Sequence, residues 1–251
     1  MVLLDGVHLV ADALAAGIPI RSAAVAIEDA VGSVNEALRV LLGRLNDASV
    51  DLVDAPAPVM AALSPVPSPS AIVALAERPR HAIDEVFAGP APLVVIAVGV
   101  QDPGNLGAII RVAEAGGATG VVATGASAGP FGWKALRGSM GSALRLPVLD
   151  DVSPEQAIAE ARRRGCRVLA TSPRGGTPVF DAVLAGPLAV LIGGEGQGLP
   201  GALLDLADAR VTIPMQAPVE SLNAAVTAAL IVYEARRQRA ASPNREPGTT
   251  S

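Results

Sequence analysis

The chain has 251 residues, of which 51% are hydrophobic, 17% are charged and only 2% are aromatic. This length and apolar share predict one large or two small domains with an aliphatic core, and they exclude a disordered chain. A single Cys excludes a disulfide framework, and with two His we expect no metal site. The sequence shows neither a signal-peptide pattern nor an apolar run long enough to span a membrane, so we expect a cytoplasmic protein.

The formal net charge is −5, and it is unevenly distributed. Residues 1–90 hold 11 acidic and 5 basic residues, whereas residues 91–251 hold 13 acidic and 14 basic residues, with Lys134 as the one lysine. Nucleic-acid-binding proteins usually carry a basic surplus, so the bulk charge argues weakly against such a partner. A local basic patch can nevertheless bind phosphate on an acidic protein.

Residues 1–80 alternate helical and extended patterns, which predicts a small α/β domain. Apolar residues at helical spacing occupy 6–17 and 34–45, and short apolar runs typical of strands occupy 23–27, 50–55 and 70–77. Residues 81–92 are rich in Pro and charge, which is typical of a linker.

From Leu93 onward the pattern changes to strands that are apolar on both faces. The apolar runs occupy residues 93–99, 120–124, 166–171, 188–194 and 211–215, and helix-length segments separate them. Such runs indicate a doubly wound α/β domain, with a parallel sheet covered by helices on both sides. We expect this domain to span residues 93–240, to end in a long amphipathic helix over 218–241, and to be followed by a disordered tail over 241–251.

Ligands of open parallel sheets bind at the carboxyl ends of the strands, and three strand ends here are polar or rich in glycine. In the first, residues 99–117, Asn105 and Gly107 stand where a helix begins and Arg111 follows one turn later. A helix start with a nearby arginine suits a phosphate. The alternative is that Asn105 only caps the helix and Arg111 is solvated.

The second segment, residues 188–200, carries four glycines after an apolar strand, and Glu195 is the one charged residue of this loop. Such a loop predicts a tight turn with a close approach to the backbone. Gly196, Gly198 and Gly201 also satisfy the G-x-G-x-x-G fingerprint of dinucleotide binding. Pro200 interrupts that pattern and no acidic residue ends the next strand, so an NAD-binding oxidoreductase is the less favoured alternative.

In the third segment, residues 213–229, Ser221 and Asn223 lead into an otherwise apolar helix. These side chains either cap the helix or form a second polar opening beside the glycine loop.

These three segments, in this order and at these distances, resemble the three motifs of the SpoU family of RNA 2′-O-ribose methyltransferases, within the SPOUT (trefoil-knot) superfamily. The resemblance runs through residues 105–122, 131–148, 191–199 and 213–230. Residues 5–20 are similar to the small ribosomal-protein-like, substrate-binding domain of many members. The resemblance implies an α/β-knot fold with a deep carboxyl-terminal trefoil knot, and a homodimer whose active site borrows residues across the interface.

The resemblance also implies that S-adenosylmethionine (AdoMet) donates a methyl group to a ribose 2′-hydroxyl of rRNA or tRNA, with no metal. The catalytic residues it implies are Asn105, Arg111, Glu195, Ser221 and Asn223. Arginine is effectively always protonated, so we expect Arg111 to orient the ribose and stabilise charge rather than to act as a base. Asn105 would position the same site, and Glu195 would hold an arginine or the amino group of the cofactor.

Cofactor-binding residues implied in the same way are Thr124, Gly193, Gly194, Gly196, Ile213, Met215 and Leu222. Core packing is the alternative for the last three. The implied RNA-binding residues are Lys134, Arg137 and Arg145, and Trp133 could stack on a base. The basic run 161–167 is more typical of a solvated helix end, and the acidic domain 1–80 offers RNA few arginines. A catalytically inert RNA- or ribosome-binding protein with the same fold is the alternative to an enzyme.

Overall fold

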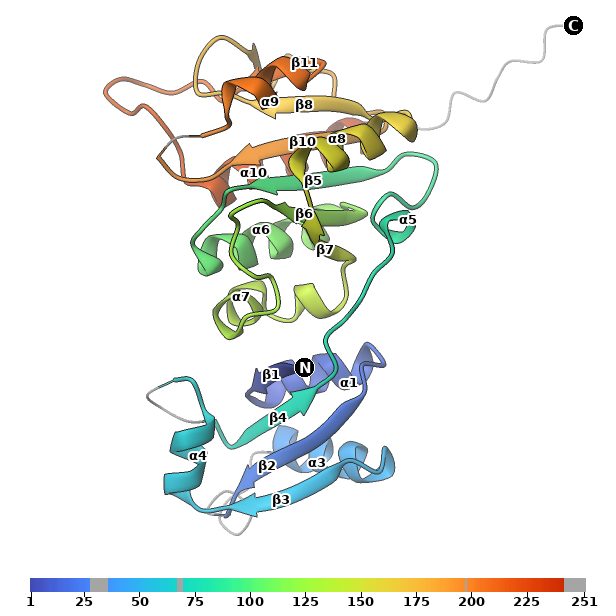
Figure 1. Cartoon of the computed structure of the whole chain (residues 1–251), viewed down its shortest axis with the longest axis vertical. Coiled ribbons are helices and arrows are strands. Elements are labelled where there is room, and N and C mark those ends of the chain that lie inside the picture. Colours follow the sequence, from blue (N-terminus) through green and yellow to red (C-terminus); the bar gives the residue numbers. More distant parts are fainter. Residues whose placement is uncertain (28–35, 67–69, 197, 242–251) are drawn as a thin grey trace, which may run out of the picture.

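The computed structural model describes residues 1–27, 36–66, 70–196 and 198–241. Two β-sheets, one above the other in Figure 1, organise the described chain, and a linker that contains α5 (Ile83–Val86) connects them. Among the described residues no helix is long and apolar enough to cross a membrane. The predicted tail begins at the last residue of the final helix, and the rest of it lies outside the described residues.

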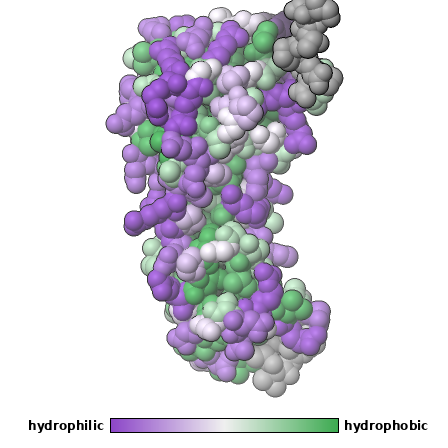
Figure 2. All heavy atoms as spheres, turned by 90° about the vertical axis from the view of Figure 1, so that its right-hand side faces the viewer, coloured by the Kyte–Doolittle hydropathy of each residue, from purple (hydrophilic) through white to green (hydrophobic). Residues whose placement is uncertain are grey.

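The amino-terminal sheet has four strands in the order β1-β4-β2-β3. Its elements are β1 (Val2–Asp5), α1 (Val7–Ala15), β2 (Ile20–Ala26), α3 (Glu36–Asp47), β3 (Asp51–Ala55), α4 (Ala57–Leu63) and β4 (Ile72–Ala76). Helices α1 and α3 bury Val10, Leu38 and Leu45 against one face. The opposite face is covered only in part, by Met60 of α4. In the view of Figure 2, exposed hydrophobic residues gather in the lower part of the molecule, which is the amino-terminal half.

The larger sheet has seven strands in the order β7-β6-β5-β10-β8-β11-β9, and all of its paired strands are parallel. Its strands are β5 (Leu93–Val98), β6 (Gly120–Thr124), β7 (Val148–Val152), β8 (Arg167–Thr171), β9 (Thr177–Pro178), β10 (Leu188–Gly193) and β11 (Ala209–Thr212). Its helices are α6 (Pro103–Gly116), α7 (Trp133–Ser139), the short 3₁₀ helix η1 (Ser142–Leu144), α8 (Pro154–Arg163), α9 (Gly201–Leu206) and α10 (Ala224–Ala241). The predicted parallel α/β sheet is thereby confirmed.

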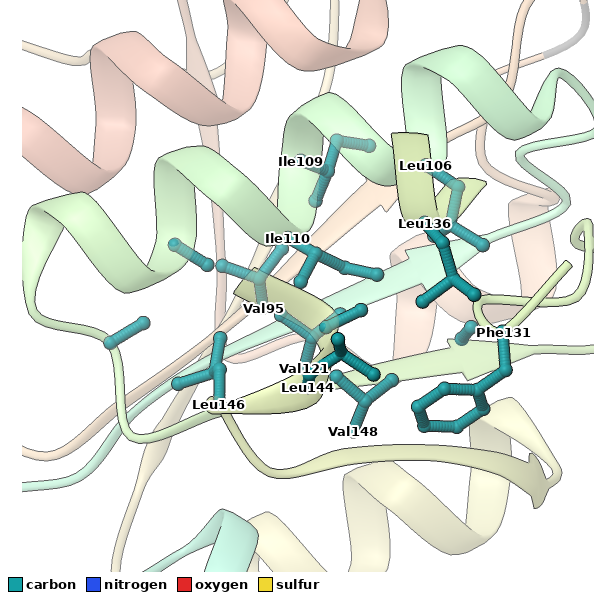
Figure 3. Packing of buried hydrophobic residues seen from close by; sticks show 14 of the residues in the cluster. Val95, Leu106, Ile109, Ile110, Val121, Phe131, Leu136, Leu144, Leu146 and Val148 are labelled. Carbon is teal, nitrogen blue, oxygen red and sulfur yellow. The ribbon is translucent and has the colours of Figure 1, made fainter. Parts of the chain in front are cut away.

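Helices cover both faces of this sheet, because its central strands β5 and β10 are apolar on both sides. Helices α6, α7 and α10 pack on one face, and α5, α8 and α9 pack on the other. Figure 3 shows part of the first cluster, in which Ile110 of α6 lies over Val95 and Val121 of the sheet.

Two arginines connect the two halves of the molecule. Arg78, in the linker, pairs with Asp150 of β7, and its guanidinium lies 5.0 Å from the centre of the Phe131 ring. Arg145, after η1, contacts Asp12 of α1 at 3.1 Å and Glu114 of α6 at 2.8 Å. The amino-terminal sheet is therefore held against the α6–α7 side of the larger sheet.

Candidate active site

A cavity of about 480 Å³ lies at the carboxyl ends of β8, β10 and β11, the edge at which ligands of parallel sheets bind. Three stretches of chain form it: the end of β8, the glycine loop after β10, and the segment between β11 and α10. The residues that line it include Thr171, Ser172, Ile192, Gly193, Gly194, Glu195, Gly196, Gly198, Leu199, Ile213, Met215, Ser221, Leu222, Asn223 and Thr227. The second and third sequence segments therefore meet in one cavity.

The glycines of this loop are needed for two different reasons. A Cβ on Gly194 would lie 1.9 Å from the carbonyl oxygen of Gly99, and one on Gly193 would lie 2.5 Å from the backbone of Gly198. Gly196 and Gly198 instead adopt φ angles of +89° and +63°, which L side chains rarely tolerate. The close approach predicted from the sequence is therefore made by the protein's own backbone, and the folded loop presents main-chain groups to the cavity.

The apolar wall contains three of the predicted cofactor residues, Ile213, Met215 and Leu222, and all three remain partly or fully exposed. Thr124 does not line this cavity. It is buried at the end of β6, and its hydroxyl donates to the carbonyl of Ala97 at 3.2 Å.

A chain of side-chain hydrogen bonds joins all three sequence segments at the rim. The amide Nδ2 of Asn105 donates to the carboxylate of Glu195, and Nδ2 of Asn223 donates to Oδ1 of Asn105 at 2.9 Å. Asn223 Oδ1 accepts the amide of Ala225 at 2.8 Å, so Asn223 caps α10 as well as joining the network. These hydrogen bonds hold the side-chain amides of Asn105 and Asn223 in fixed orientations at the rim of the cavity.

Asn105 is free to join this network because another residue caps α6. Asp102 is the N-cap, and its carboxylate accepts the backbone N–H of Asn105 at 2.7 Å. The interpretation of Asn105 as a plain helix cap is therefore wrong, since its backbone is the capped group and its side chain points to Glu195.

Two predicted catalytic residues lie differently. Ser221 is exposed and lines the cavity beside the network. Arg111 is exposed on α6 and does not line the cavity, and its side chain makes no hydrogen bond or ion pair with any other residue that the structure describes. A single copy of the chain thus brings together Asn105, Glu195, Ser221 and Asn223 but leaves Arg111 outside.

The basic residues separate into paired and unpaired groups. Lys134 and Arg137 of α7 are exposed, and neither has an acidic partner in the described part of the chain. Arg145 is committed to Asp12 and Glu114. In the basic run 161–167, at the end of α8, three arginines pair with carboxylates, as expected for a solvated helix end. The pairs are Arg162 with Asp208, Arg163 with Glu160, and Arg164 with Asp84.

Thr171 and Ser172 line the cavity although the sequence reasoning assigned them no role. Thr171 ends β8 and donates its hydroxyl to the Leu191 carbonyl at 2.9 Å. The signal was present: two hydroxyl residues close an apolar strand of a parallel sheet, and strand β8 neighbours β10. Within the described ranges, no group of His, Cys, Asp or Glu side chains is arranged so that it could hold a metal ion.

An open parallel sheet, a glycine loop and an apolar cavity with a hydrogen-bonded polar rim define an α/β protein that binds a small organic cofactor at its strand ends. The model of the SpoU rRNA Methylase family matches residues 92–233, which is more than half of the chain. The protein belongs to this family.

Relatives match well beyond the cavity. A Synechocystis protein described as an uncharacterized tRNA/rRNA methyltransferase is 33% identical over 240 residues, covering 94% of this chain and 84% of its own. A Bacillus subtilis 23S rRNA (guanosine(2553)-2′-O)-methyltransferase is 34% identical, covering 70% of this chain and 68% of its own. The crystal structure of the SpoU methyltransferase AviRb from Streptomyces viridochromogenes with AdoMet superimposes with a TM-score of 0.86 at 32% identity, covering 96% of this chain and 91% of that one.

Proposed function

We propose that this protein is an AdoMet-dependent RNA methyltransferase that modifies a ribose 2′-hydroxyl of rRNA or tRNA. The observation that carries the proposal is the cavity behind the glycine loop, with the Glu195–Asn105–Asn223 network at its rim, in a chain of the SpoU family. The AdoMet complex of AviRb and the 2′-O-methyltransferase activity named for the Bacillus relative support the same cofactor and reaction.

The residues present fit AdoMet. Its adenine is flat and uncharged, which suits the apolar wall of Leu199, Ile213 and Leu222. Backbone groups of the glycine loop supply hydrogen bonds beside this wall. Glu195 is the one charged side chain among the residues that line the cavity in the described chain, and a carboxylate there favours a cationic ligand. When bound, AdoMet supplies a methyl group on an electrophilic sulfonium.

The chain's own residues then have to place the 2′-hydroxyl oxygen in line with that methyl group and to ease the loss of its proton. Asn105, held by Glu195 and Asn223, offers a fixed amide at the rim for the ribose. Ser221 lies next to it with a free position for a further hydrogen bond to the sugar. We assign Arg111 to orientation of the ribose or its phosphate, because a guanidinium keeps its proton at neutral pH.

Arg111 lies outside the cavity of its own copy, and we propose that it acts in a homodimer. Val226, Leu230 and Tyr233 of α10 recur every three or four residues and are 46%, 36% and 50% exposed. This apolar stripe suits a second copy of the chain. It lies beside α6, because Val232 of α10 packs against Gly116 of that helix. Pairing through α10 would carry Arg111 of one copy toward the cavity of the partner. We also propose that the carboxyl-terminal part of the chain forms the deep trefoil knot and that the protein is cytoplasmic.

On the RNA side, we keep Lys134 and Arg137 as phosphate contacts, because they are exposed and unpaired in the described chain. We assign Arg145 to the contact between the two halves of the molecule instead, because two carboxylates already hold it.

The test combines cofactor binding with methyl transfer. Calorimetric titration should show that AdoMet binds and that NAD does not, and AdoMet labelled on its methyl group should transfer the label to ribosomal or transfer RNA from a strain lacking the gene. Mapping of 2′-O-methyl groups then locates the nucleotide. AdoMet binding without transfer to either RNA would favour the inert RNA-binding protein.

Shared use of the active site has its own test. The Arg111→Ala protein and the Asn105→Ala protein should each be inactive alone. A mixed dimer with one copy of each should regain up to about half of the activity of the wild-type dimer, because one of its two cavities then contains both intact residues. Mixed dimers that stay inactive would contradict the placement of Arg111 in the partner's cavity.

A further inference from the structure

A second cavity, of about 420 Å³, lies between the two halves of the molecule, away from the glycine loop. The turn after β1 and the start of α1 form one wall, and α7 forms the other. Figure 1 shows α7 on the side of the larger sheet that faces β1. Its lining mixes apolar, basic and acidic side chains, with Trp133, Arg137 and Met140 on one side and Leu3 and Asp5 on the other.

The α7 wall exposes a large flat side chain. Trp133 is the one tryptophan of the chain and is 37% exposed, and Met140 beside it is 52% exposed. Phe87 and Phe131 are buried, and the exposed rings of Phe180 and Tyr233 do not line this cavity. In a protein with so few aromatic residues, an indole left open on a cavity wall is suited to stacking on another ring, and nucleic-acid bases stack on such side chains whatever their sequence.

Positive charge beside the indole is free to bind an anion. Lys134 lies 5.4 Å from the centre of the Trp133 ring, and neither it nor Arg137 pairs with a carboxylate among the described residues. Elsewhere the exposed arginines are mostly paired, as in Arg21 with Glu77. An aromatic platform with unpaired cations next to it matches one nucleotide, with the base on the ring and the phosphate at the cations.

On the opposite wall, one carboxylate oxygen lacks a hydrogen-bond partner among the described residues. Asp5 lines the cavity; its Oδ2 accepts the Ser64 hydroxyl at 2.5 Å, whereas its Oδ1 is buried with no partner in the part of the chain that the structure describes. A buried carboxylate oxygen without a partner is costly, and a donor that enters the cavity would remove that cost. Guanine suits this position because its edge carries an N–H and an NH₂ side by side.

This cavity is one helix away from the candidate active site. Helix α7 packs directly on the first turns of α6: a Cβ on Gly107 would lie 2.4 Å from the carbonyl oxygen of Ala135, and one on Gly138 would lie 3.1 Å from that of Gly104. Asn105 lies between Gly104 and Gly107 on the same turns. An RNA strand that presents one ribose to Asn105 can therefore place a nearby nucleotide in the second cavity, on the far side of α7.

We propose that this second cavity binds an unstacked guanine of the RNA substrate. The base stacks on Trp133 and directs its N–H donors at Asp5, and the adjoining phosphate lies at Lys134 and Arg137. The inference rests on the proposed function only in taking RNA as the substrate. It adds a specificity site, formed by both halves of the molecule, that selects which RNA reaches the ribose-methylating centre.

The experiment uses the full-length protein and single-stranded uridine 11-mers whose sixth, central nucleotide is guanosine, uridine or an abasic ribose. Because Trp133 is the one tryptophan, its fluorescence reports directly on this cavity. The guanosine strand should quench it saturably and bind several-fold more tightly than either the uridine or the abasic strand, whose flanking uridines can stack on the indole but do not match Asp5. Equal affinity for all three strands would overturn the proposal.

Variants separate stacking, charge and the base edge, with anisotropy of labelled strands as the readout. Trp133→Ala should weaken binding of the guanosine strand about 5- to 100-fold, and Trp133→Phe should retain most of the affinity. Asp5→Asn should abolish the preference for guanosine over uridine. Arg137→Gln should reduce the salt dependence by about one phosphate contact, whereas Arg44→Gln, another exposed and unpaired arginine in the described chain, should not.

The result can be told apart from failure of the proposed function. All of these variants should bind AdoMet with unchanged affinity, which also shows that they fold. If Trp133→Ala binds the guanosine strand like the unmodified protein, the cavity is not a base site even if ribose methylation is confirmed. If no RNA is methylated but Trp133 is quenched as expected, the base site stands and the enzymatic proposal fails.

Discussion

The two sheets differ in how completely they are covered. In the larger sheet, every residue of β5 is buried, and so is β10 up to its last residue. In the amino-terminal sheet, β3 is mostly open on one side, where Val53 is 51% and Leu75 of β4 is 39% exposed. Strands packed on both faces hold the loops at their ends in fixed positions, as a catalytic rim requires. The amino-terminal sheet leaves apolar side chains such as Val53 exposed, and the second cavity forms where the two halves meet.

Replacing a glycine by alanine should lower the free energy of unfolding in the larger sheet and raise it in the amino-terminal half. The loss in the larger sheet is the largest effect that we expect. Gly194→Ala would force a Cβ to within 1.9 Å of the Gly99 carbonyl oxygen, so β5 and β10 would have to separate at the cavity. We expect a loss of about 3 kcal/mol or more in the free energy of unfolding and no measurable AdoMet binding. Gly43→Ala lies within helix α3, where nothing is within 4 Å, and should stabilise the protein by about 0.5–1 kcal/mol.

Chemical denaturation and AdoMet titration measure both effects. Gly201→Ala, at the first residue of α9 just after the glycine loop, is the nearby control, because its Cβ would meet nothing within 4 Å. If Gly194→Ala were as stable as Gly201→Ala, the close approach of the two strand ends would be wrong.

The rim network should affect the reaction more than the stability. Asn105→Ala removes the amide that bridges Glu195 and Asn223, so the ribose would lose its fixed hydrogen-bonding partner. We expect kcat to fall about 100- to 1,000-fold while the AdoMet dissociation constant changes by less than about threefold. Asn46→Ala, on an exposed part of α3, should leave both unchanged. A matching rise in the dissociation constant for AdoMet would instead assign Asn105 to cofactor binding.

Sequence reasoning succeeded where the physics is local. The apolar runs predicted β5 and β10, because strands of a covered parallel sheet have no polar face. It missed β1 and α7, whose four and seven residues are too short for a periodic signal. The predicted final helix, 218–241, begins only at Ala224, because Asn223 rather than an earlier residue caps it.

Within the site, the strand-end pattern pointed to the glycine loop and both asparagines, and the structure brings them together at one cavity and its rim. It could not show that Asp102 caps α6, because two adjacent polar residues can each do so. It could not show that Arg145 belongs to Asp12, which lies more than a hundred residues away. It could not show that Arg111 lies outside the cavity of its own copy, and the partner copy that we propose for it is specified by no local pattern.

A glutamate–arginine pair three residues apart on a helix occurs in both halves and gives a matched test of burial. Glu234 of α10 is 7% exposed and accepts hydrogen bonds from Arg237 and Gln238, which lower its pKa to about 2. Glu36 of α3 pairs with Arg39 in the open. Because the folded pKa of Glu234 is lowered, its stabilisation is complete above about pH 4.5 and is lost as the pH falls toward 2.

We therefore expect Glu234→Gln to cost about 1–2 kcal/mol in the free energy of unfolding at pH 7 and progressively less below pH 4.5. Glu36→Gln should cost less than about 0.5 kcal/mol at any pH. Urea denaturation across this pH range measures both, and a penalty for Glu234→Gln that is independent of pH would contradict the role of its charge.

The smallest expected effect lies at the junction of the two halves. Burial alone would raise the pKa of the Glu114 carboxyl, but hydrogen bonds from Arg145 and Ser142 lower it overall, so Arg145 stabilises the charged form of Glu114 as well as contacting Asp12. These groups are partly exposed, so Arg145→Gln should cost only about 0.5–1 kcal/mol, against less than about 0.5 kcal/mol for Arg39→Gln in an open pair. The salt dependence of RNA binding decides between the two roles of Arg145. A phosphate contact would make the slope shallower by about one contact, as for Arg137→Gln, whereas a contact between the halves leaves the slope unchanged, which is the outcome we expect because two carboxylates already occupy the guanidinium.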